Sequence, residues 1–368
     1  MHYKFPTDMP SISKRIKNIN PNSYVKNRNF IDGSVTQLSP YISRGVISTK
    51  IVFDFLLEQS YDLNKIEKFI QELAWRDYWQ QIWISKGELI NQDLKTPQIN
   101  VTNHKISHAF IDCQTGINAI DDALSAFYQT GYMHNHLRMY VASLVCNIAE
   151  SHWKTPAKWM YYYLLDADWA SNALSWQWVC GSNSHKKYIA NQENINKYCY
   201  TKQSNTYLDV SYEKLSSCEV PLELNNFTDL KLQTKLPKSN IESIDSNKTT
   251  LIYNFYNLDP QWHKETDANR VLLLEPQIFQ DYPISDLSVK FMLDLSLNIN
   301  NIQIFVGSFE QLIKAYKLKN VTYKEHPLNS HYQGNMEPRD WIFNVSGYFP
   351  SFFKYWKECK KQLKSYIA

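Results

Sequence analysis

The chain has 368 residues, of which 43% are hydrophobic and 14% are aromatic. This composition excludes a disordered protein and allows two domains of ordinary size, each with a hydrophobic core. The formal net charge of +3 permits nucleic-acid binding without requiring it, so local basic clusters must support any such assignment. The sequence has no run of about eighteen apolar residues and no apolar segment near its start. We therefore expect a cytoplasmic protein without a membrane span or secretory signal.

The six cysteines are scattered along the chain and include no CxxC pair. Such spacing is typical of reduced thiols and disfavours both a disulfide framework and a zinc site. An iron–sulfur cluster has no support in the spacing either. We therefore predict no metal site.

Residues 1–225 show helical periodicity and almost no strand-like alternation, which predicts a mostly helical domain. The clearest helical patterns cover residues 66–86, 118–128, 135–150 and 156–178. Polar residues dominate 226–250, where Ser, Asn and Lys are frequent and large apolar side chains are few. This composition predicts a linker between two domains.

Short apolar runs and helical patterns alternate after the linker. The runs are LIYNF, RVLLLEP, IQIFVG and VTYKEHP, and the helical patterns cover 285–297 and 309–317. Such alternation is typical of βαβ units, so we predict a small α/β domain with a parallel sheet over 251–368. The fold class is therefore α plus α/β. The domain lacks GxGxxG and GxxxxGK[ST], so no phosphate-binding loop marks it as a nucleotide enzyme by itself.

The first of four motifs is FIDGSVTQLSPYISRGVIS at 30–48. Ser39 followed by Pro40 predicts an N-cap with proline at the first helical position. The hydroxyls of Thr36 and Ser39 would then lie at the positive end of a helix, where a phosphate can bind. The alternative is an ordinary capped helix start.

The second motif, QELAWRDYWQQIW at 71–83, has Glu72, Trp75, Arg76 and Trp79 on one helix face. Two indoles beside a carboxylate could hold a flat base. The alternative is an amphipathic helix with core tryptophans and an ordinary pair between Glu72 and Arg76.

The third motif is GYMHNHLRMYVAS at 131–143, in which Asn135 and Met139 share a helix face beside Arg138. His134 and His136 are two residues apart and do not share a face, which disfavours a metal site.

The fourth motif is LLDADWASNALSWQW at 164–178. Asp168, Asn172 and Trp176 are spaced to line one helix face, with Asp166 and Trp178 at its edge. Such a polar face is costly to bury without a ligand. The alternative is a partly exposed helix with core aromatics and locally paired aspartates.

The four motifs, in this order over residues 20–180, resemble the flavin domain of the photolyase/cryptochrome family. This resemblance implies an all-helical domain that binds FAD in a folded conformation, with Arg138 paired to Asp166 and Asn172 facing flavin N5. Val35 departs from the family pattern, in which a hydroxyl residue is usual. The implied cofactor contacts are Tyr24, Thr36, Leu38, Ser39, Trp75, Arg76, Asn135, Arg138, Asp166, Asp168 and Asn172.

Within the family, the sequence is most similar to photolyases that repair cyclobutane pyrimidine dimers. In these enzymes a flipped-out dimer packs between tryptophans and meets a Glu, an Asn and a Met. The matching catalytic residues here are Glu72, Trp75, Asn135, Met139 and Trp178, together with Asn172. Asn135 stands where a photolyase for (6-4) products would have a second histidine, which argues against that lesion. The implied activity is that of a deoxyribodipyrimidine photolyase, a light-dependent carbon–carbon lyase acting on UV-damaged DNA.

Two other functions stay open at this stage. One is a cryptochrome-like blue-light photoreceptor that binds FAD and signals without repair. The other is a helical nucleic-acid-binding protein that has lost flavin.

The resemblance also implies contacts with DNA and a path for electrons. DNA phosphates would meet Arg28, Arg44, His136, Lys186 and Lys187. His136 replaces the usual Arg, so binding would depend more strongly on pH.

Trp176 and Trp153 match the first two members of the family's tryptophan chain, but residues 94–108 contain neither Trp nor Tyr where the outermost would lie. Trp159, Tyr161, Tyr162 or another aromatic residue could serve as the exit, and the sequence does not choose among them. The segment after Trp178 also departs from the family pattern.

The domain order is unusual for the family, whose α/β domain normally precedes the flavin domain. Residues 302–327 and 343–357 resemble parts of that α/β domain, which implies that it is permuted to follow the flavin domain here. The alternative is an unrelated α/β module. Whether it holds a pterin or deazaflavin antenna stays open, and we expect a monomer.

Overall fold

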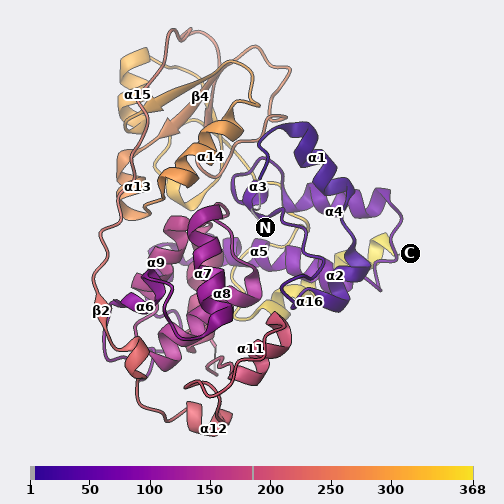
Figure 1. The fold of residues 1–368 in the computed structure, drawn as a ribbon. Coiled ribbons are helices and arrows are strands. Elements are labelled where there is room, and N and C mark those ends of the chain that lie inside the picture. The colour runs from indigo at the N-terminus through magenta and orange to yellow at the C-terminus, as the bar shows by residue number, and fades with distance from the viewer. Residues whose placement is uncertain (1–4, 185, 368) are drawn as a thin grey trace. The chain divides into compact units, whose positions relative to one another are not determined.

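The computed structural model describes residues 5–184 and 186–367 (Figure 1). The chain folds into two compact units made of interleaved segments. Unit 1 comprises residues 20–35 and 86–232, and unit 2 comprises 5–19, 36–85 and the chain from 233 onward. This division differs from the domains predicted from the sequence, which stay a prediction. None of the described helices combines the length and the hydropathy needed to cross a bilayer.

Unit 1 is built almost entirely from helices. Its α7 to α10 pack against one another, and α7, α8 and α9 are the magenta helices of Figure 1. Its elements are α2 (Pro21–Asn27), η1 (Gly87–Asn91), β1 (Ile106–Ser107), α6 (His108–Ile111), α7 (Asn118–Thr130), α8 (Asn135–Ser143), η2 (Leu144–Ile148), α9 (Lys154–Tyr163), α10 (Trp169–Cys180), α11 (Gln192–Cys199), α12 (Tyr212–Leu215), η3 (Leu222–Leu224) and β2 (Phe227–Thr228).

Unit 2 combines four N-terminal helices with the α/β part of the chain. The helices are α1 (Met9–Lys17), α3 (Ser39–Ser43), α4 (Thr49–Glu58) and α5 (Glu67–Lys86). The α/β part contains β3 (Thr250–Tyr253), β4 (Asn269–Leu274), α13 (Pro276–Asp281), α14 (Asp286–Ser296), β5 (Ile302–Val306), α15 (Phe309–Tyr316), β6 (Val321–Lys324), η4 (Pro327–Asn329), β7 (Asn335–Glu337), α16 (Phe352–Leu363) and η5 (Lys364–Tyr366).

The sheet of unit 2 has the order β5-β4-β3-β6-β7, and all its neighbouring strands are parallel. The four apolar runs form β3 to β6, so the predicted fold class, a helical region followed by a parallel-sheet α/β region, is confirmed. β7 escaped prediction because Asn-Met-Glu is a short, polar edge strand. The sheet buries an apolar core that includes Ile252, Leu273 and Leu312.

Helix α5 is held within unit 2 by the end of the chain. The buried Asp77 carboxylate accepts hydrogen bonds from the Thr49 hydroxyl at 2.8 Å and the Ile342 backbone N–H at 3.0 Å. Burial raises the pKa of Asp77 to about 6. Trp75 stacks on Phe352 of α16, with ring centroids 3.9 Å apart. The C-terminal helix thus completes the packing of a helix that lies more than 250 residues earlier in the sequence.

The predicted helical pattern at 156–178 breaks in the middle, and the expectation that Asp168 lies on a helix face was wrong. Helix α9 ends at Tyr163, and Asp168 is the N-cap of α10, where its side chain accepts from the Ser171 N–H at 2.7 Å. An aspartate at this position satisfies an otherwise unpaired N–H of the first turn. Residues 164–168 therefore form a turn, which we call the Asp turn.

Glycine fixes the path of the Asp turn. Gly131 ends α7 with a φ of +65°, and its carbonyl accepts from the Leu165 N–H at 2.8 Å. A Cβ at this position would lie 2.8 Å from the Leu165 side chain and 3.0 Å from the Tyr163 carbonyl oxygen. Only glycine suits both this backbone conformation and this close approach.

Candidate functional site

An ion pair joins the start of α8 to the Asp turn in unit 1. Arg138 Nη2 lies 3.1 and 3.0 Å from the two carboxylate oxygens of Asp166, and Arg138 Nε donates to the Met133 carbonyl at 2.8 Å. The Asp166 side chain is 3% exposed and that of Arg138 is 20% exposed. The pairing predicted from the sequence is therefore present, and it sets the position of the turn that carries Asp166 and Asp168.

The start of α10 presents buried polar groups. The Asn172 amide donates to the Ala157 carbonyl at 2.7 Å. The buried Ser171 hydroxyl, one residue earlier, has no hydrogen-bond partner among the described residues. Buried acceptors without partners are costly unless a ligand supplies a donor. The edge of a flavin ring carries N–H and C=O groups, so these residues of unit 1 fit FAD.

The helix start that was predicted to bind a phosphate lies in unit 2. The residue that caps this helix is not the one that the sequence suggested. Ser39 is the first residue of α3, and the N-cap is Leu38, whose side chain cannot cap. The interpretation of Ser39 as N-cap was therefore wrong. Helix α3 has only five residues, so it carries little helix dipole. Thr36 accepts from the Leu38 N–H at 3.3 Å, and Leu38 is buried.

The second motif lies on α5, also in unit 2. Glu72 forms an ion pair with Lys68 at 2.9 Å, and Arg76 Nη1 donates to the Ser43 hydroxyl at 2.9 Å. Trp75 has one ring face covered by Phe352, and Tyr78 and Trp79 pack against it as well. A flat ligand could therefore stack on Trp75 only from the opposite face.

The predicted lesion-contacting residues of unit 1 are accessible to solvent. Asn135 is exposed at the start of α8, Met139 is half-buried one turn further along the same face, and Trp178 of α10 is 38% exposed. Tyr24, a predicted cofactor contact in α2, is half-buried.

One predicted DNA contact was wrong. Arg44 is fully buried in unit 2, with its guanidinium carbon 3.2 Å from the centroid of the Phe255 ring. Its side chain cannot reach a phosphate at the surface. The sequence could not reveal this burial because Phe255 lies more than 200 residues later.

The remaining predicted DNA contacts lie in unit 1. Lys186 is exposed and Lys187 is half-buried. Arg28 is half-buried and donates to the Val25 carbonyl at 3.1 Å. Burial, together with the charge of Arg28, lowers the pKa of His136 to about 4. His136 is therefore neutral near pH 7 and supplies no positive charge there.

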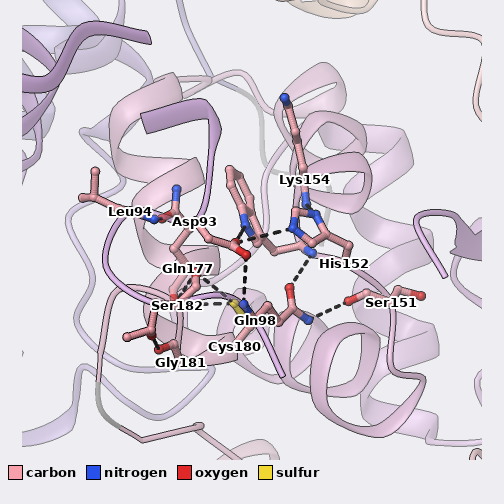
Figure 2. Close-up of polar contacts among 12 residues, drawn as sticks. Asp93, Leu94, Gln98, Ser151, His152, Lys154, Gln177, Cys180, Gly181 and Ser182 are labelled. Atoms are coloured by element: carbon pink, nitrogen blue, oxygen red, sulfur yellow. Dashed lines mark hydrogen bonds and ion pairs between the residues drawn. The ribbon is translucent and has the colours of Figure 1, made fainter. Parts of the chain in front are cut away.

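Both predicted electron-transfer tryptophans are buried in unit 1, Trp153 at 0% and Trp176 at 2% exposure. Trp153 Nε1 donates to Asp93 Oδ1 at 2.7 Å. Figure 2 shows Asp93 at the centre of a hydrogen-bond network that includes Gln98 and His152. Asp93 was missed at the sequence level because it lies 60 residues before Trp153 and belongs to no recognisable motif.

Comparisons with known proteins agree with this architecture. The family model for the FAD binding domain of DNA photolyase matches residues 69–209. Deoxyribodipyrimidine photo-lyases of Agrobacterium fabrum and Alkalihalophilus pseudofirmus are 31% and 28% identical over 167 residues. These alignments cover 44% and 42% of this chain and 35% and 33% of the relatives, so the chain matches about a third of their length.

Among solved structures, a cryptochrome from Synechocystis sp. PCC6803 overlaps with a TM-score of 0.46 and 20% identity, over 54% of this chain and 44% of that one. The assignment rests on the family model and the aligned relatives, together with the helical region and the parallel-sheet region that follows it. The chain therefore contains, over residues 69–209, the FAD-binding domain of the photolyase/cryptochrome family.

Proposed function

We propose that the protein is a deoxyribodipyrimidine photolyase, which uses light to split cyclobutane pyrimidine dimers flipped out of DNA. The observation that carries this proposal is the exposure of Trp178. It is 38% exposed, whereas the other described tryptophans of unit 1 (Trp153, Trp159, Trp169 and Trp176) are at most 2% exposed. An indole left in water is costly, and base stacking is a common use of one.

Two lysines that follow α10 in the sequence lie on a segment hydrogen-bonded to the end of this helix. The Ser184 hydroxyl lies 2.9 Å from the Trp178 carbonyl oxygen and 2.7 Å from that of Lys186. The Tyr188 N–H donates to the Val179 carbonyl at 2.9 Å. Lys186 and Lys187 are thereby held next to the end of α10. An exposed aromatic ring and lysines on neighbouring segments are features that single nucleic-acid strands and flipped bases favour.

Asn135 and Met139, both on α8, would contact the lesion. The Asn135 amide has both a donor and an acceptor for the edge of a pyrimidine. The flexible Met139 thioether can pack against a non-planar, dimerised pair of rings. Both face solvent from one side of α8, which supports a role in contacting a ligand.

In unit 2, Glu72 and Trp75 would meet the lesion. The Glu72 carboxylate can accept hydrogen bonds from pyrimidine N–H groups, since its pairing with Lys68 leaves it 31% exposed. Trp75, which is half-buried, would stack on a ring of the lesion with the face that Phe352 does not cover.

Bound FAD, once fully reduced, would supply the electron that light drives into the dimer. The chain's own residues would bind and orient the cofactor. Arg138 and Asp166 would brace the Asp turn, and the carbonyl oxygen of Asn172 would accept an N–H of the flavin edge. Trp176 and Trp153 would pass electrons inward to restore the reduced state.

A blue-light photoreceptor is the second candidate. The neutral state of His136 and the burial of Arg44 favour it, since each removes an expected contact with DNA. A receptor would keep FAD without any preference for damaged DNA.

Binding in the dark separates the two functions. We would measure the affinity of the FAD-loaded protein for an oligonucleotide with one thymine dimer and for the same sequence undamaged. A photolyase should prefer the damaged strand by at least about tenfold, and Trp178→Ala should reduce this preference while leaving the FAD content unchanged. Equal affinity for both strands would refute the proposal and favour the receptor.

A further inference from the structure

The indole of Trp153 is locked in place by a carboxylate. Its Nε1–H donates to Asp93 Oδ1 at 2.7 Å, and the Gln98 backbone N–H donates to Asp93 Oδ2 at 2.9 Å. Gln98 Oε1 accepts from the Trp153 backbone N–H at 2.9 Å, and Gln98 Nε2 donates to the Ser151 carbonyl at 2.9 Å. Figure 2 shows Asp93, Gln98 and Ser151 gathered in this way. Trp153 is therefore fixed at both its ring nitrogen and its backbone.

The carboxyl group of Asp93 has access to solvent, although the indole has none. The Asp93 side chain is 21% exposed, whereas Trp153 is 0% exposed. His152 Nε2 lies 3.4 Å from Asp93 Oδ1, and the His152 ring stacks on exposed His104 with ring centroids 4.8 Å apart. Asp93 thus lies between a buried indole and the molecular surface.

Other charged groups face this network. Burial lowers the pKa of His152, with His104 and Lys154 acting in the same direction and Asp93 opposing them. The Lys154 N–H donates to His152 Nδ1 at 3.3 Å, so a neutral His152 carries its proton on Nε2, which faces Asp93. Asp93 therefore receives donors from Trp153, Gln98 and His152.

The segment expected to carry a third tryptophan or tyrosine beyond Trp153 has neither. Residues 94–108 contain neither Trp nor Tyr. Among the described residues, the ring contact of Trp153 is with His152, at 5.7 Å between centroids. Of the candidates for the exit, Trp159 packs on Phe127 and Tyr128, and Tyr161 packs on Trp169. Among the described residues, neither a Trp nor a Tyr ring is in direct contact with Trp153 on its outer side.

We propose that Asp93 accepts the Nε1 proton of Trp153 when Trp153 gives up an electron toward bound FAD. Proton loss would then take the place of a third tryptophan in preventing return of the electron. This inference rests on the electron-transfer role proposed above for Trp153 and Trp176.

The step balances as follows. One electron leaves the indole ring by way of Trp176 toward oxidised, photo-excited FAD. The N–H bond of Trp153 breaks, its electron pair stays on nitrogen, and the proton moves to Asp93 Oδ1. A neutral indole radical and a neutral carboxylic acid remain. A thiol from solution then returns one electron and one proton, and Asp93 releases its proton to water.

The chemistry of indole favours this transfer. A neutral indole N–H is a very weak acid, and losing one electron makes it a far stronger one. A charge-assisted hydrogen bond of 2.7 Å places the base in contact before the reaction begins. Because Trp153 is excluded from water, Asp93 is the base within reach of the ring nitrogen.

Flash photolysis of the protein carrying oxidised FAD tests the proposal. We expect the wild-type radical to appear in its deprotonated form, and to form more slowly in D₂O. In Asp93→Asn the radical should stay protonated and recombine, so photoreduction in the presence of a thiol should fall by about a hundredfold, the lower end of what a positioned base contributes. Asp112→Asn, which alters a carboxylate with a 55% exposed side chain in the same unit, should behave as wild type.

A second readout does not involve the flavin. The Nε1–H resonance of Trp153 in ¹H–¹⁵N spectra recorded in the dark should move in Asp93→Asn, because its charged acceptor is gone. A protonated wild-type radical without a D₂O effect would overturn the proposal, and so would normal photoreduction in an Asp93→Asn protein whose resonance has moved. If Asp93→Asn does not fold, the wild-type radical and its D₂O effect decide alone. Repair by chemically reduced wild-type protein needs no electron from Trp153, so its failure would refute only the proposed function.

Discussion

Arg138 holds Asp166 by two hydrogen bonds from a single nitrogen, Nη2, at 3.1 and 3.0 Å. The pair links α8 to the Asp turn, from which α10 begins. We predict that Asp166→Asn lowers the free energy of unfolding by roughly 3 kcal/mol, because it leaves a largely buried guanidinium without its counter-charge. The variant should also lose FAD. Chemical denaturation and flavin absorbance after purification measure both effects.

An exposed ion pair in the same unit provides the control. Lys105 and Asp229 lie 2.8 Å apart with side chains 47% and 78% exposed. Asp229→Asn should cost less than about 1 kcal/mol and leave the FAD content unchanged. If both variants lower the free energy of unfolding by the same amount, the Arg138–Asp166 pair would have no special role.

Trp178 should contribute binding energy for damaged DNA and none for folding. Trp178→Ala should weaken binding of a dimer-containing oligonucleotide by about 1–3 kcal/mol, the usual value of one stacked base. Trp178→Phe should recover part of the loss. Fluorescence anisotropy measures the affinity, and a loss of stability equal to that of a core substitution would contradict the exposed position of the ring.

Gly131 and Gly87 share a left-handed backbone conformation but differ in the space around them. Both have positive φ, +65° and +52°, but a Cβ at Gly87 meets nothing within 4 Å, whereas one at Gly131 meets Leu165 at 2.8 Å. Gly87→Ala should cost about 1 kcal/mol from backbone strain alone, and Gly131→Ala at least about 2 kcal/mol more through the clash. Thermal unfolding of the two variants measures the difference, and equal values would show that the Asp turn adapts at no cost.

His134 should make unit 1 sensitive to acid. Its Nδ1 caps α8 by accepting from the His136 N–H at 3.2 Å, and burial lowers its pKa from 6.5 to about 4, with the charges of His136 and Arg138 acting in the same direction. The unfolded chain therefore binds a proton more readily, so stability is full above pH 6.5 and falls as the pH drops toward 4. The loss from this group is at most about 3 kcal/mol.

The difference between wild type and His134→Asn isolates this contribution. Asn caps a helix well, so the two proteins should have similar stability at pH 7.5 and diverge below pH 6.5, with the wild type losing more. Subtracting the curves removes the effect of Asp77, whose raised pKa acts in the opposite direction. Parallel curves from urea unfolding at each pH would contradict the prediction.

Aromatic side chains pack together just after the carboxyl ends of β3 and β6, where the strand order reverses. Tyr256 stacks on His326 with ring centroids 4.1 Å apart, Trp83 lies edge-on to His326 at 5.0 Å, and the Arg44 guanidinium lies over Phe255. Open parallel sheets bind their ligands at this point. We therefore predict that chromophores released from the denatured protein consist of FAD without a pterin or deazaflavin, and an equimolar second chromophore would refute this.

The sequence predicted those features that depend on local patterns. The helical periodicity located α5, α7 and α14 to within a few residues, and the apolar runs located β3 to β6. It could not predict the break before α10. The spacing of Asp168 suits a position on a helix face, whereas its side chain also suits an N-cap. The hydrogen bond between Leu165 and Gly131, which are distant in the sequence, decides for the N-cap. The periodicity also could not predict contacts between side chains that lie far apart in the sequence.

Two side chains illustrate that second limit. Arg44 looked like a surface cation because nothing near it in the sequence could cover it, yet Phe255 does. Trp75 was expected to help hold a flat base, and the structure shows that Phe352 covers one face of its ring. In both cases the partner lies in the α/β part of the chain.

Light-dependent repair is the most direct test of the proposed function. Chemically reduced, FAD-loaded protein would be mixed with an oligonucleotide containing one thymine dimer and exposed to blue light, with a dark sample beside it. We predict that absorbance in the thymine band recovers in the light and not in the dark. No recovery by protein that holds reduced FAD would contradict the assignment as a photolyase.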